Sequence, residues 1–172
     1  MMKGNILIYT GNGGGKTTAA LGLAMRAVGH NQKAVVIQFM KGWKNTGEYL
    51  IKSRLKDNYE IKQFGRKEFV NLKKPSVKDK TLAKKGLLYA RKKIAEKPCL
   101  LVLDEINLVA SIGLLDKKEV LEMLKFIPSE TITILTGRNA PKEFIDYADY
   151  AVEVRDIKRP KKTLPPRKGF EY

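Results

Sequence analysis

The feature that most constrains this sequence is a glycine-rich segment near its start, TGNGGGKTT at residues 10–18. An apolar run at residues 6–9 precedes it, and an apolar stretch at residues 19–28 follows it. This order predicts a buried strand, a flexible loop and a helix, which together form a phosphate cradle from backbone N–H groups and a helix N-terminus. The chain is therefore expected to bind the polyphosphate of a nucleotide, and the loop alone leaves open which bond is broken.

The loop departs slightly from the strict P-loop pattern G-x-x-x-x-G-K-[ST]. Thr10 stands in the first glycine position, and the glycines after it supply the freedom that turns N–H groups inward. Lys16 would place a positive charge on the phosphates, and the Thr17 hydroxyl suits a magnesium ion that bridges them. The predicted nucleotide-binding residues of the loop are Gly11, Asn12, Gly13, Gly14, Gly15, Lys16, Thr17 and Thr18.

A carboxylate partner for this loop is expected at the end of another apolar strand. Residues 100–103 form such a strand, and Asp104 and Glu105 follow it directly. Because parallel strands end at the same edge of a sheet, both carboxylates should lie near the loop. One of the two carboxylates, Asp104 or Glu105, can hold the metal with Thr17, directly or through water, and the other could be a second metal contact or a base for water in an ATPase. The predicted catalytic residues are Lys16, Thr17 and Glu105. Arg138 follows a later strand at the same edge, where it could contact a phosphate or a partner element.

Short apolar strands alternate with longer helical stretches along the whole chain. This alternation predicts an α/β fold of the P-loop NTPase type, RecA-like, with a mostly parallel sheet of about six strands and helices on both faces. A length of 172 residues suits one domain. The expected strands are residues 6–9, 34–39, 60–64, 100–103, 131–135 and 151–154, and the expected helices include residues 17–28, 48–56, 141–147 and a long one capped by Ser76. Residues 155–172 should be an irregular basic tail, which is either loose or lies over the ligand site.

Composition narrows the classes of function. The chain carries 34 Lys and Arg against 18 Asp and Glu, a formal charge of +16, in scattered lysine doublets without interleaved aromatic residues. Nucleic-acid binding is therefore not expected, and no run is long enough for a membrane span. One histidine, His30, and one cysteine, Cys99, cannot build a multi-ligand zinc site or a Cys–His dyad. We expect Cys99 to be a core residue and the protein to act in the reducing cytoplasm.

Five blocks, taken together, resemble those of one family, the ATP:corrinoid adenosyltransferases of the CobA, BtuR and CobO type. They span most of the chain in the family's order and spacing. The blocks are TGNGGGKTTAALGLAMRAVGH at residues 10–30, VVIQFMKG at 35–42, LVLDEIN at 101–107, ILTGRNAP at 134–141 and GFEY at 169–172.

The resemblance implies transfer of the 5′-deoxyadenosyl group of ATP to Co(I) of a corrinoid such as cobalamin, with release of triphosphate. It implies Mg²⁺, or possible use of Mn²⁺, held by Thr17 and Glu105 with Asp104 beside them. It also implies an electron donor such as a flavodoxin or flavin reductase, and a homodimer. Because Co(I) is itself a strong nucleophile, such a site needs no general base.

Two positions depart from the family's pattern. The family loop commonly reads GNGKGKTT, and Gly14 stands here in place of its first lysine, so Lys41 or Arg138 could take over that phosphate contact. The family also carries a Phe-x-Trp pair against the corrin, where this chain has Phe69 and Asn71, while its one tryptophan, Trp43, lies elsewhere. Phe69 and Asn71 are the predicted corrinoid-binding residues.

Two other classes of protein share parts of this pattern. A RecA-like ATPase acting on nucleic acid would fit the positive charge and the Asp104–Glu105 pair. A nucleotide-binding regulator without chemistry would fit the loop alone. The identity of the reaction product distinguishes all three.

Overall fold

A computed structural model describes residues 4–160 and 165–170, and its centre is one parallel six-stranded sheet. The strand order is β3-β2-β4-β5-β1-β6, and every neighbouring pair is parallel, so the carboxyl ends of all the strands lie at one edge. The predicted α/β architecture is confirmed. The strands are β1 (Ile6–Thr10), β2 (Ala34–Phe39), β3 (Tyr59–Phe64), β4 (Leu100–Asp104), β5 (Ile132–Thr136) and β6 (Tyr150–Glu153).

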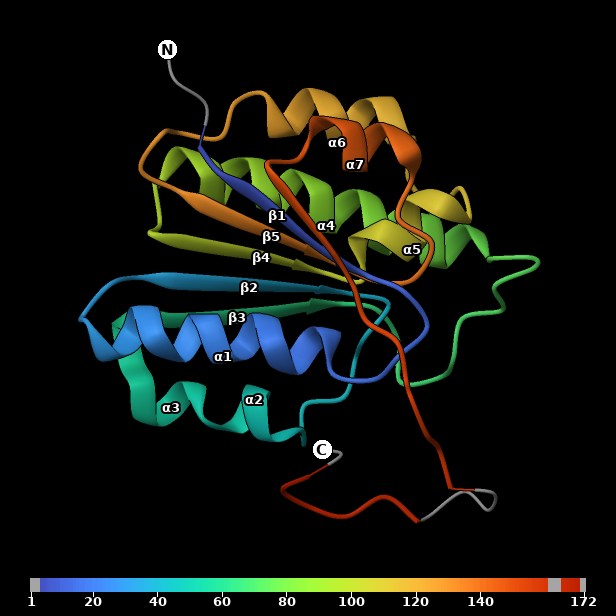
Figure 1. Cartoon of the computed structure of the whole chain (residues 1–172), viewed down its shortest axis with the longest axis horizontal. Coiled ribbons are helices and arrows are strands. Elements are labelled where there is room, and N and C mark those ends of the chain that lie inside the picture. The colour runs from blue at the N-terminus through green and yellow to red at the C-terminus, as the bar shows by residue number, and fades with distance from the viewer. Residues whose placement is uncertain (1–3, 161–164, 171–172) are drawn as a thin grey trace.

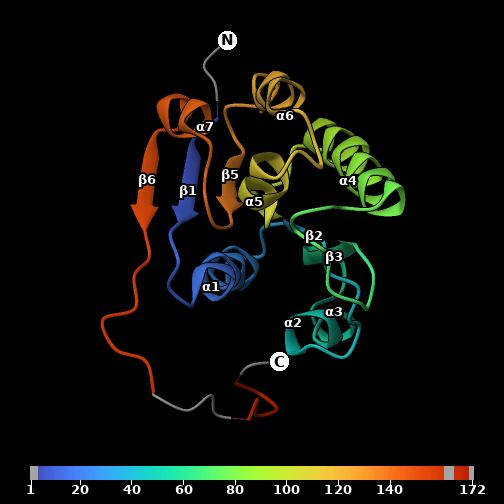
Figure 2. The same ribbon diagram turned by 90° about the vertical axis from the view of Figure 1, so that its right-hand side faces the viewer.

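Helices cover both faces of this sheet (Figure 1). One face carries α4, α5, α6 and α7, and the other carries α1, α2 and α3; Figure 2 shows the same two layers from the side. The helices are α1 (Lys16–Gly29), α2 (Gly47–Leu50), α3 (Lys52–Leu55), α4 (Val77–Ala95), α5 (Ile106–Ser111), α6 (Lys117–Leu124) and α7 (Lys142–Tyr147).

Two apolar clusters, one on each face, hold the layers together. The strands β2 and β4 are buried along their full length, as expected for central parallel strands covered on both faces. On the α1 face, Ala20 and Ala24 are fully buried, and these small side chains let the helix lie close to the sheet. On the other face, Leu87 and Ala90 of α4 pack in the larger cluster.

The helix α4 begins as the sequence predicts. The Ser76 hydroxyl accepts a hydrogen bond from the Asp79 N–H at 3.2 Å, and the Asp79 carboxylate accepts one from the Ser76 N–H at 2.9 Å. This reciprocal capping box satisfies two donors at the helix start.

Two details differ from expectation. The helix predicted at residues 48–56 is present but interrupted: α2 and α3 are separated at Ile51, and a 3₁₀ turn follows at Lys56–Asn58. Tyr49, Ile51 and Leu55 all pack toward the sheet, although a continuous helix would place Tyr49 and Ile51 on nearly opposite faces. Cys99 is half-buried beside β4 and is not a core residue.

The described residues after β6 contain no helix or strand, as predicted for the tail. Residues 169 and 170 of the predicted terminal block are described, and residues 171 and 172 lie outside the described part. Within the described residues, no helix is long and apolar enough to cross a membrane.

Candidate functional site

The glycine-rich loop joins the end of β1 to the start of α1 at the carboxyl edge of the sheet. Gly11 and Gly15 have φ angles of +92° and +95°, in the left-handed region that favours glycine. A Cβ atom on Gly11 would also lie 2.5 Å from the Val154 carbonyl oxygen. These two glycines are therefore required by the backbone, and they aim the first N–H groups of α1 out of the sheet edge, where they have no partner within the helix.

Lys16 lies back along the loop that precedes it. Its Nζ atom donates to the carbonyl oxygens of Gly11 at 2.8 Å and Gly13 at 2.6 Å. Burial lowers the pKa of Lys16; the nearby charge of Glu105 raises it, and those of Arg138 and Arg159 lower it again. Charges of both signs therefore surround this amine.

Asp104 is a fully buried carboxylate with four hydrogen-bond donors. Three of them are neutral: the Thr17 hydroxyl at 2.8 Å, the Thr136 hydroxyl at 2.6 Å and the Gln38 amide at 3.1 Å. Burial alone would raise the pKa of Asp104, but the Lys41 ammonium and the hydroxyls of Thr136 and Thr17 hold it below the usual value. Asp104 is therefore an anion at working pH, and its carboxylate holds the Thr17 hydroxyl in place by accepting a hydrogen bond from it.

Lys41 is the charged donor of this group. Its Nζ atom lies 2.7 Å from Asp104 Oδ2 and 3.3 Å from Thr17 Oγ1. Burial opposes its charge, but the Asp104 carboxylate raises the pKa of Lys41 above the usual value. The suggestion that Lys41 replaces a phosphate contact beside Gly14 is therefore not favoured, because this amine is committed to Asp104.

Glu105 has the features of a cation ligand. Its backbone is left-handed, with φ +66°, and its N–H donates to the Thr136 hydroxyl at 3.0 Å. Its Oε2 atom is buried and has no hydrogen-bond partner among the described residues. Burial and the charge of Asp104 raise the pKa of Glu105. A bound cation would satisfy this oxygen, and the carboxylate and hydroxyl oxygens of Glu105 and Thr17 suit Mg²⁺, so the residues present fit a magnesium site.

The segment after β6 lies on the glycine-rich loop. The Gly13 N–H donates to the Val154 carbonyl oxygen at 2.8 Å, and the Gly14 N–H donates to Asp156 Oδ1 at 3.0 Å. A cavity of about 460 Å³ opens there, lined by Asn12, Gly13, Arg138, Glu153, Arg155, Asp156 and Arg159. Of the two possibilities for the tail, its described first part lies over the site.

A second cavity, of about 310 Å³, adjoins the first at the same sheet edge. Its walls are mostly apolar, and it shares Arg138 with the first cavity and reaches Glu105 of the cation site. The lining residues are Phe39, Met40, Lys41, Phe69, Val70, Leu72, Glu105, Leu108 and Arg138. Phe69 is 96% exposed, which is unusual for a large apolar side chain and marks a surface that suits an apolar ligand.

The loop that carries Phe69 is tied down at two places. The Arg66 guanidinium donates to Asp79 at 2.9 Å, and the Trp43 indole N–H donates to the Lys67 carbonyl oxygen at 2.7 Å. The one tryptophan thus supports this loop, a role that sequence reasoning missed. The Asn71 side-chain oxygen accepts from the N–H groups of Lys73 and Lys74, so it shapes the loop from within.

An apolar groove of about 460 Å³ lies between α4 and α6, lined in part by Ile94, Met123 and Phe126. It lies at the amino ends of β4 and β5, and it contains none of the predicted site residues. Ligands of parallel α/β sheets bind at the carboxyl ends of the strands, so we assign binding to that edge.

The structure brings Lys16, Thr17, Asp104 and Glu105 together, with Arg138 on the wall of the adjoining cavities. Thr18 is exposed in the first turn of α1, and His30 caps the far end of that helix, away from the site. Sequence reasoning missed Gln38, Thr136 and Arg159. A signal existed for Gln38, which is a polar residue in the otherwise apolar strand AVVIQF, in register with Asp104.

Comparisons with known proteins agree over nearly the whole chain. A sequence model of the family described as ATP:corrinoid adenosyltransferase BtuR/CobO/CobP matches residues 2–172. The chain is 34% identical to a corrinoid adenosyltransferase of Sinorhizobium over 99% of its length and 81% of that protein. It is 31% identical to the corrinoid adenosyltransferase of Escherichia coli K12, over 91% of this chain and 79% of that one.

The fold is also found in a solved structure. A KaiC-like protein of Pyrococcus horikoshii superimposes with a TM-score of 0.55, covering 90% of this chain and 74% of that one. The two sequences are 18% identical, so this likeness concerns the fold alone.

Proposed function

Since the chain belongs to the ATP:corrinoid adenosyltransferase family, we propose that its P-loop edge performs that family's transfer with the residues described above. In this reaction the Co(I) ion of the substrate corrinoid supplies an electron pair to C5′ of ATP. The cobalt–carbon bond forms, the C5′–O bond breaks, and triphosphate leaves with the bonding pair. Formally, Co(I) becomes Co(III).

The glycine-rich loop would grip the leaving triphosphate. Lys16 and the first N–H groups of α1 supply positive potential at the sheet edge, and Arg138 adds a guanidinium between the two cavities. Negative charge on a leaving group is stabilised most by donors that are already in place. We assign triphosphate binding to Gly11, Asn12, Gly13, Gly14, Gly15, Lys16, Thr17, Thr18 and Arg138.

We assign Mg²⁺ to Thr17 and Glu105, with Asp104 holding the Thr17 hydroxyl at 2.8 Å. Mn²⁺ could occupy the same oxygen ligands. When bound, the cation would neutralise charge on the triphosphate. The observation that supports this site is the buried Glu105 Oε2 atom, which has no other partner among the described residues.

The corrinoid would lie on the apolar cavity beside Phe69. This is the observation that carries the proposal: an apolar cavity shares Arg138 with the cavity at the glycine-rich loop, and it also reaches Glu105 of the cation site. A cobalt ion in the apolar cavity and a triphosphate on the glycine-rich loop would have C5′ between them. Fixing this alignment can supply roughly 7–11 kcal/mol of the barrier. Phe69 would contact the corrin, and Asn71 would act by shaping the loop.

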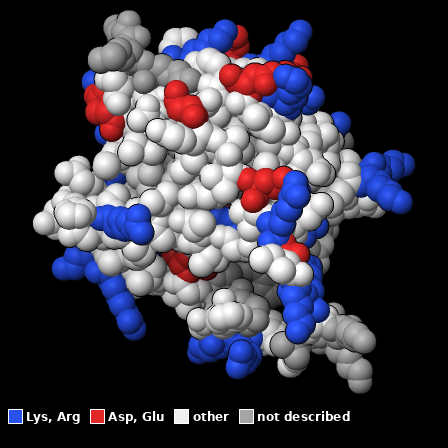
Figure 3. Space-filling model, in the orientation of Figure 1, with Lys and Arg blue, Asp and Glu red and all other residues white. Residues whose placement is uncertain are grey.

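A RecA-like ATPase acting on nucleic acid is not favoured. Family membership points to adenosyl transfer. On the face shown in Figure 3, Lys and Arg side chains lie scattered around the rim with Asp and Glu among them, and they do not gather in a stripe.

The proposal is tested by product identity. The protein is incubated with ATP, Mg²⁺ and chemically reduced cobalamin, and we expect a light-sensitive adenosylcobalamin spectrum together with triphosphate. Lys16→Ala should abolish both products. Release of ADP and phosphate stimulated by DNA, without adenosylcobalamin, would refute the proposal.

We also propose that the protein acts in the cytoplasm as a homodimer and receives electrons for Co(I) from a flavodoxin or a flavin reductase. The family resemblance supports the dimer and the donor, and the free Cys99 suits a reducing compartment. Light scattering of the purified protein tests the dimer. Turnover with reduced flavodoxin in place of a chemical reductant tests the donor.

A further inference from the structure

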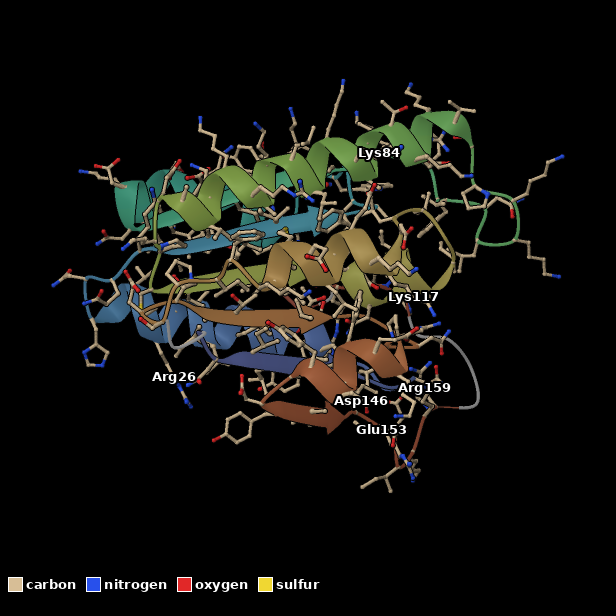
Figure 4. All side chains as sticks on the ribbon, turned by 90° about the horizontal axis from the view of Figure 1, so that it is seen from above. Arg26, Lys84, Lys117, Asp146, Glu153 and Arg159 are labelled. Atoms are coloured by element: carbon tan, nitrogen blue, oxygen red, sulfur yellow. The ribbon has the colours of Figure 1, made fainter. Side chains whose placement is uncertain are left out.

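The segment from Val154 to Arg159 lies against the glycine-rich loop and touches it at three residues. Its contacts are Val154 with Gly13, Asp156 with Gly14 and a long contact of 3.4 Å from Arg159 Nη2 to the Asn12 carbonyl oxygen. Figure 4 places Arg159 and Glu153 at the end of the sheet toward which the strands point, while Arg26 lies toward the other end. The segment therefore belongs to the triphosphate edge of the molecule.

Asp156 occupies a donor that a phosphate would use. Its Oδ1 atom accepts from the Gly14 N–H at 3.0 Å, and its Oδ2 atom pairs with Arg159. The hydrogen bond from Gly14 and the guanidinium of Arg159 both lower the pKa of Asp156, so it is an anion. A carboxylate and a phosphate oxygen cannot share this N–H at close range without repulsion, so a bound triphosphate would displace Asp156.

Arg159 is placed where it can pair with a bound triphosphate. Its side chain is 62% exposed and lines the cavity with Arg138 and Arg155. Arg155 is already paired with Glu153. Once a phosphate oxygen has displaced the Asp156 carboxylate from the Gly14 N–H, Arg159 can bind the triphosphate, since a planar guanidinium can bind phosphate oxygens in pairs.

On these contacts we propose that Arg159 is a triphosphate-binding residue of this enzyme, held ready by Asp156, whose carboxylate gives up the Gly14 N–H to a phosphate oxygen. The inference rests on the proposed function, because it assumes that the loop binds triphosphate.

The two residues make opposite predictions for one measurement, the dissociation constant of inorganic triphosphate with Mg²⁺, determined by calorimetry on the full chain. Arg159→Ala should weaken binding about tenfold, and Arg159→Lys should restore part of the loss. Asp156→Ala should tighten binding roughly three- to fivefold, because it removes a competing anion. Both effects should shrink as salt is added, since the groups are exposed.

Lys158→Ala is the matched control, because it removes one positive charge from the same segment but lies outside the residues that line the cavity. It should bind triphosphate within twofold of the wild type. Melting temperatures of all variants should agree, since these side chains are exposed.

Equal weakening by Arg159→Ala and Lys158→Ala would overturn the inference, because it would show a general charge effect. Weaker binding by Asp156→Ala would overturn it as well. If the wild type makes adenosylcobalamin and Arg159→Ala binds triphosphate normally, only this inference fails. If the wild type neither binds triphosphate nor makes adenosylcobalamin, the proposed function fails with it.

Discussion

The pair between Lys41 and Asp104 gives the sharpest prediction about the centre of the site. Lys41 Nζ lies 2.7 Å from Asp104 Oδ2, and the Asp104 side chain is fully buried. Lys41→Met keeps most of the aliphatic stem and removes the charge. Asp104 would then keep its bonds to Thr17, Thr136 and Gln38 but would have no cation beside it.

The size of the effect follows from burial. Removing one partner of a fully buried ion pair costs about 3–5 kcal/mol. The Lys41 side chain is 32% exposed and three neutral donors remain, so we expect about 2–3 kcal/mol in the free energy of unfolding. For a chain of this length, each kcal/mol lowers Tm by about 2–4 °C, which gives a fall of about 4–12 °C.

The assay is denaturant unfolding of Lys41→Met, Asp104→Asn and the double variant. Because the two residues contact each other, the double variant should be less destabilised than the sum of the single ones. The pKa of Asp104 is lower in the folded protein than in the unfolded chain, so its ionised form stabilises the fold above about pH 4, and this contribution is lost as the pH falls through the folded pKa. The difference in the free energy of unfolding between wild type and Lys41→Met should therefore shrink as pH falls below about 4. Additive single effects, or a difference that does not change with pH, would show that Lys41 and Asp104 are not coupled.

Three further predictions concern the loops. Gly15→Ala should lower the free energy of unfolding by about 1–2 kcal/mol and weaken ATP binding, because the φ of Gly15 is +95°. Gly14→Ala should change that free energy by no more than about 0.5 kcal/mol in thermal melts, because its Cβ atom would have only Asp156 Oδ1 nearby, at 3.9 Å. Equal losses for the two variants would contradict the loop geometry. Phe69→Ala should raise KM for cobalamin several-fold with KM for ATP unchanged, and a change in KM for ATP alone would count against the assigned corrinoid surface. The Arg66 guanidinium and the Ser76 cap lower the pKa of Asp79 to about 2, so its ionised form should add about 2 kcal/mol to the free energy of unfolding above pH 4, and this contribution is lost toward pH 2. Acid unfolding of Asp79→Asn should lack this loss. A wild-type curve of stability against pH for that variant would disprove the pairing.

Much of the fold could be predicted because central parallel strands are simple apolar runs. The run AVVIQF matches β2 to the residue, since both of its faces are covered. The helix α5 (Ile106–Ser111) was missed because it is a short, mostly apolar run that begins just after the Asp104–Glu105 pair. A short buried helix and a strand cannot be separated by periodicity there.

The site was predictable where it depends on local pattern. Lys16, Thr17, Asp104 and Glu105 were found because a loop and a strand end each carry their own signal. The contact between Gly14 and Asp156 joins residues 142 positions apart, and no local pattern reports it. The same holds for Trp43, whose indole N–H meets a backbone carbonyl group and not a side chain that the sequence would name.

If the P-loop of this chain holds a leaving group, the C5′–O bond of ATP breaks during the reaction. The most direct test uses ATP labelled with ¹⁸O at the oxygen that bridges C5′ and the α-phosphorus, with reduced cobalamin and Mg²⁺, and mass spectrometry of the products. We expect all of the label in the released triphosphate, in step with adenosylcobalamin. Label retained on a nucleoside or nucleotide product, with cleavage between phosphates, would contradict it.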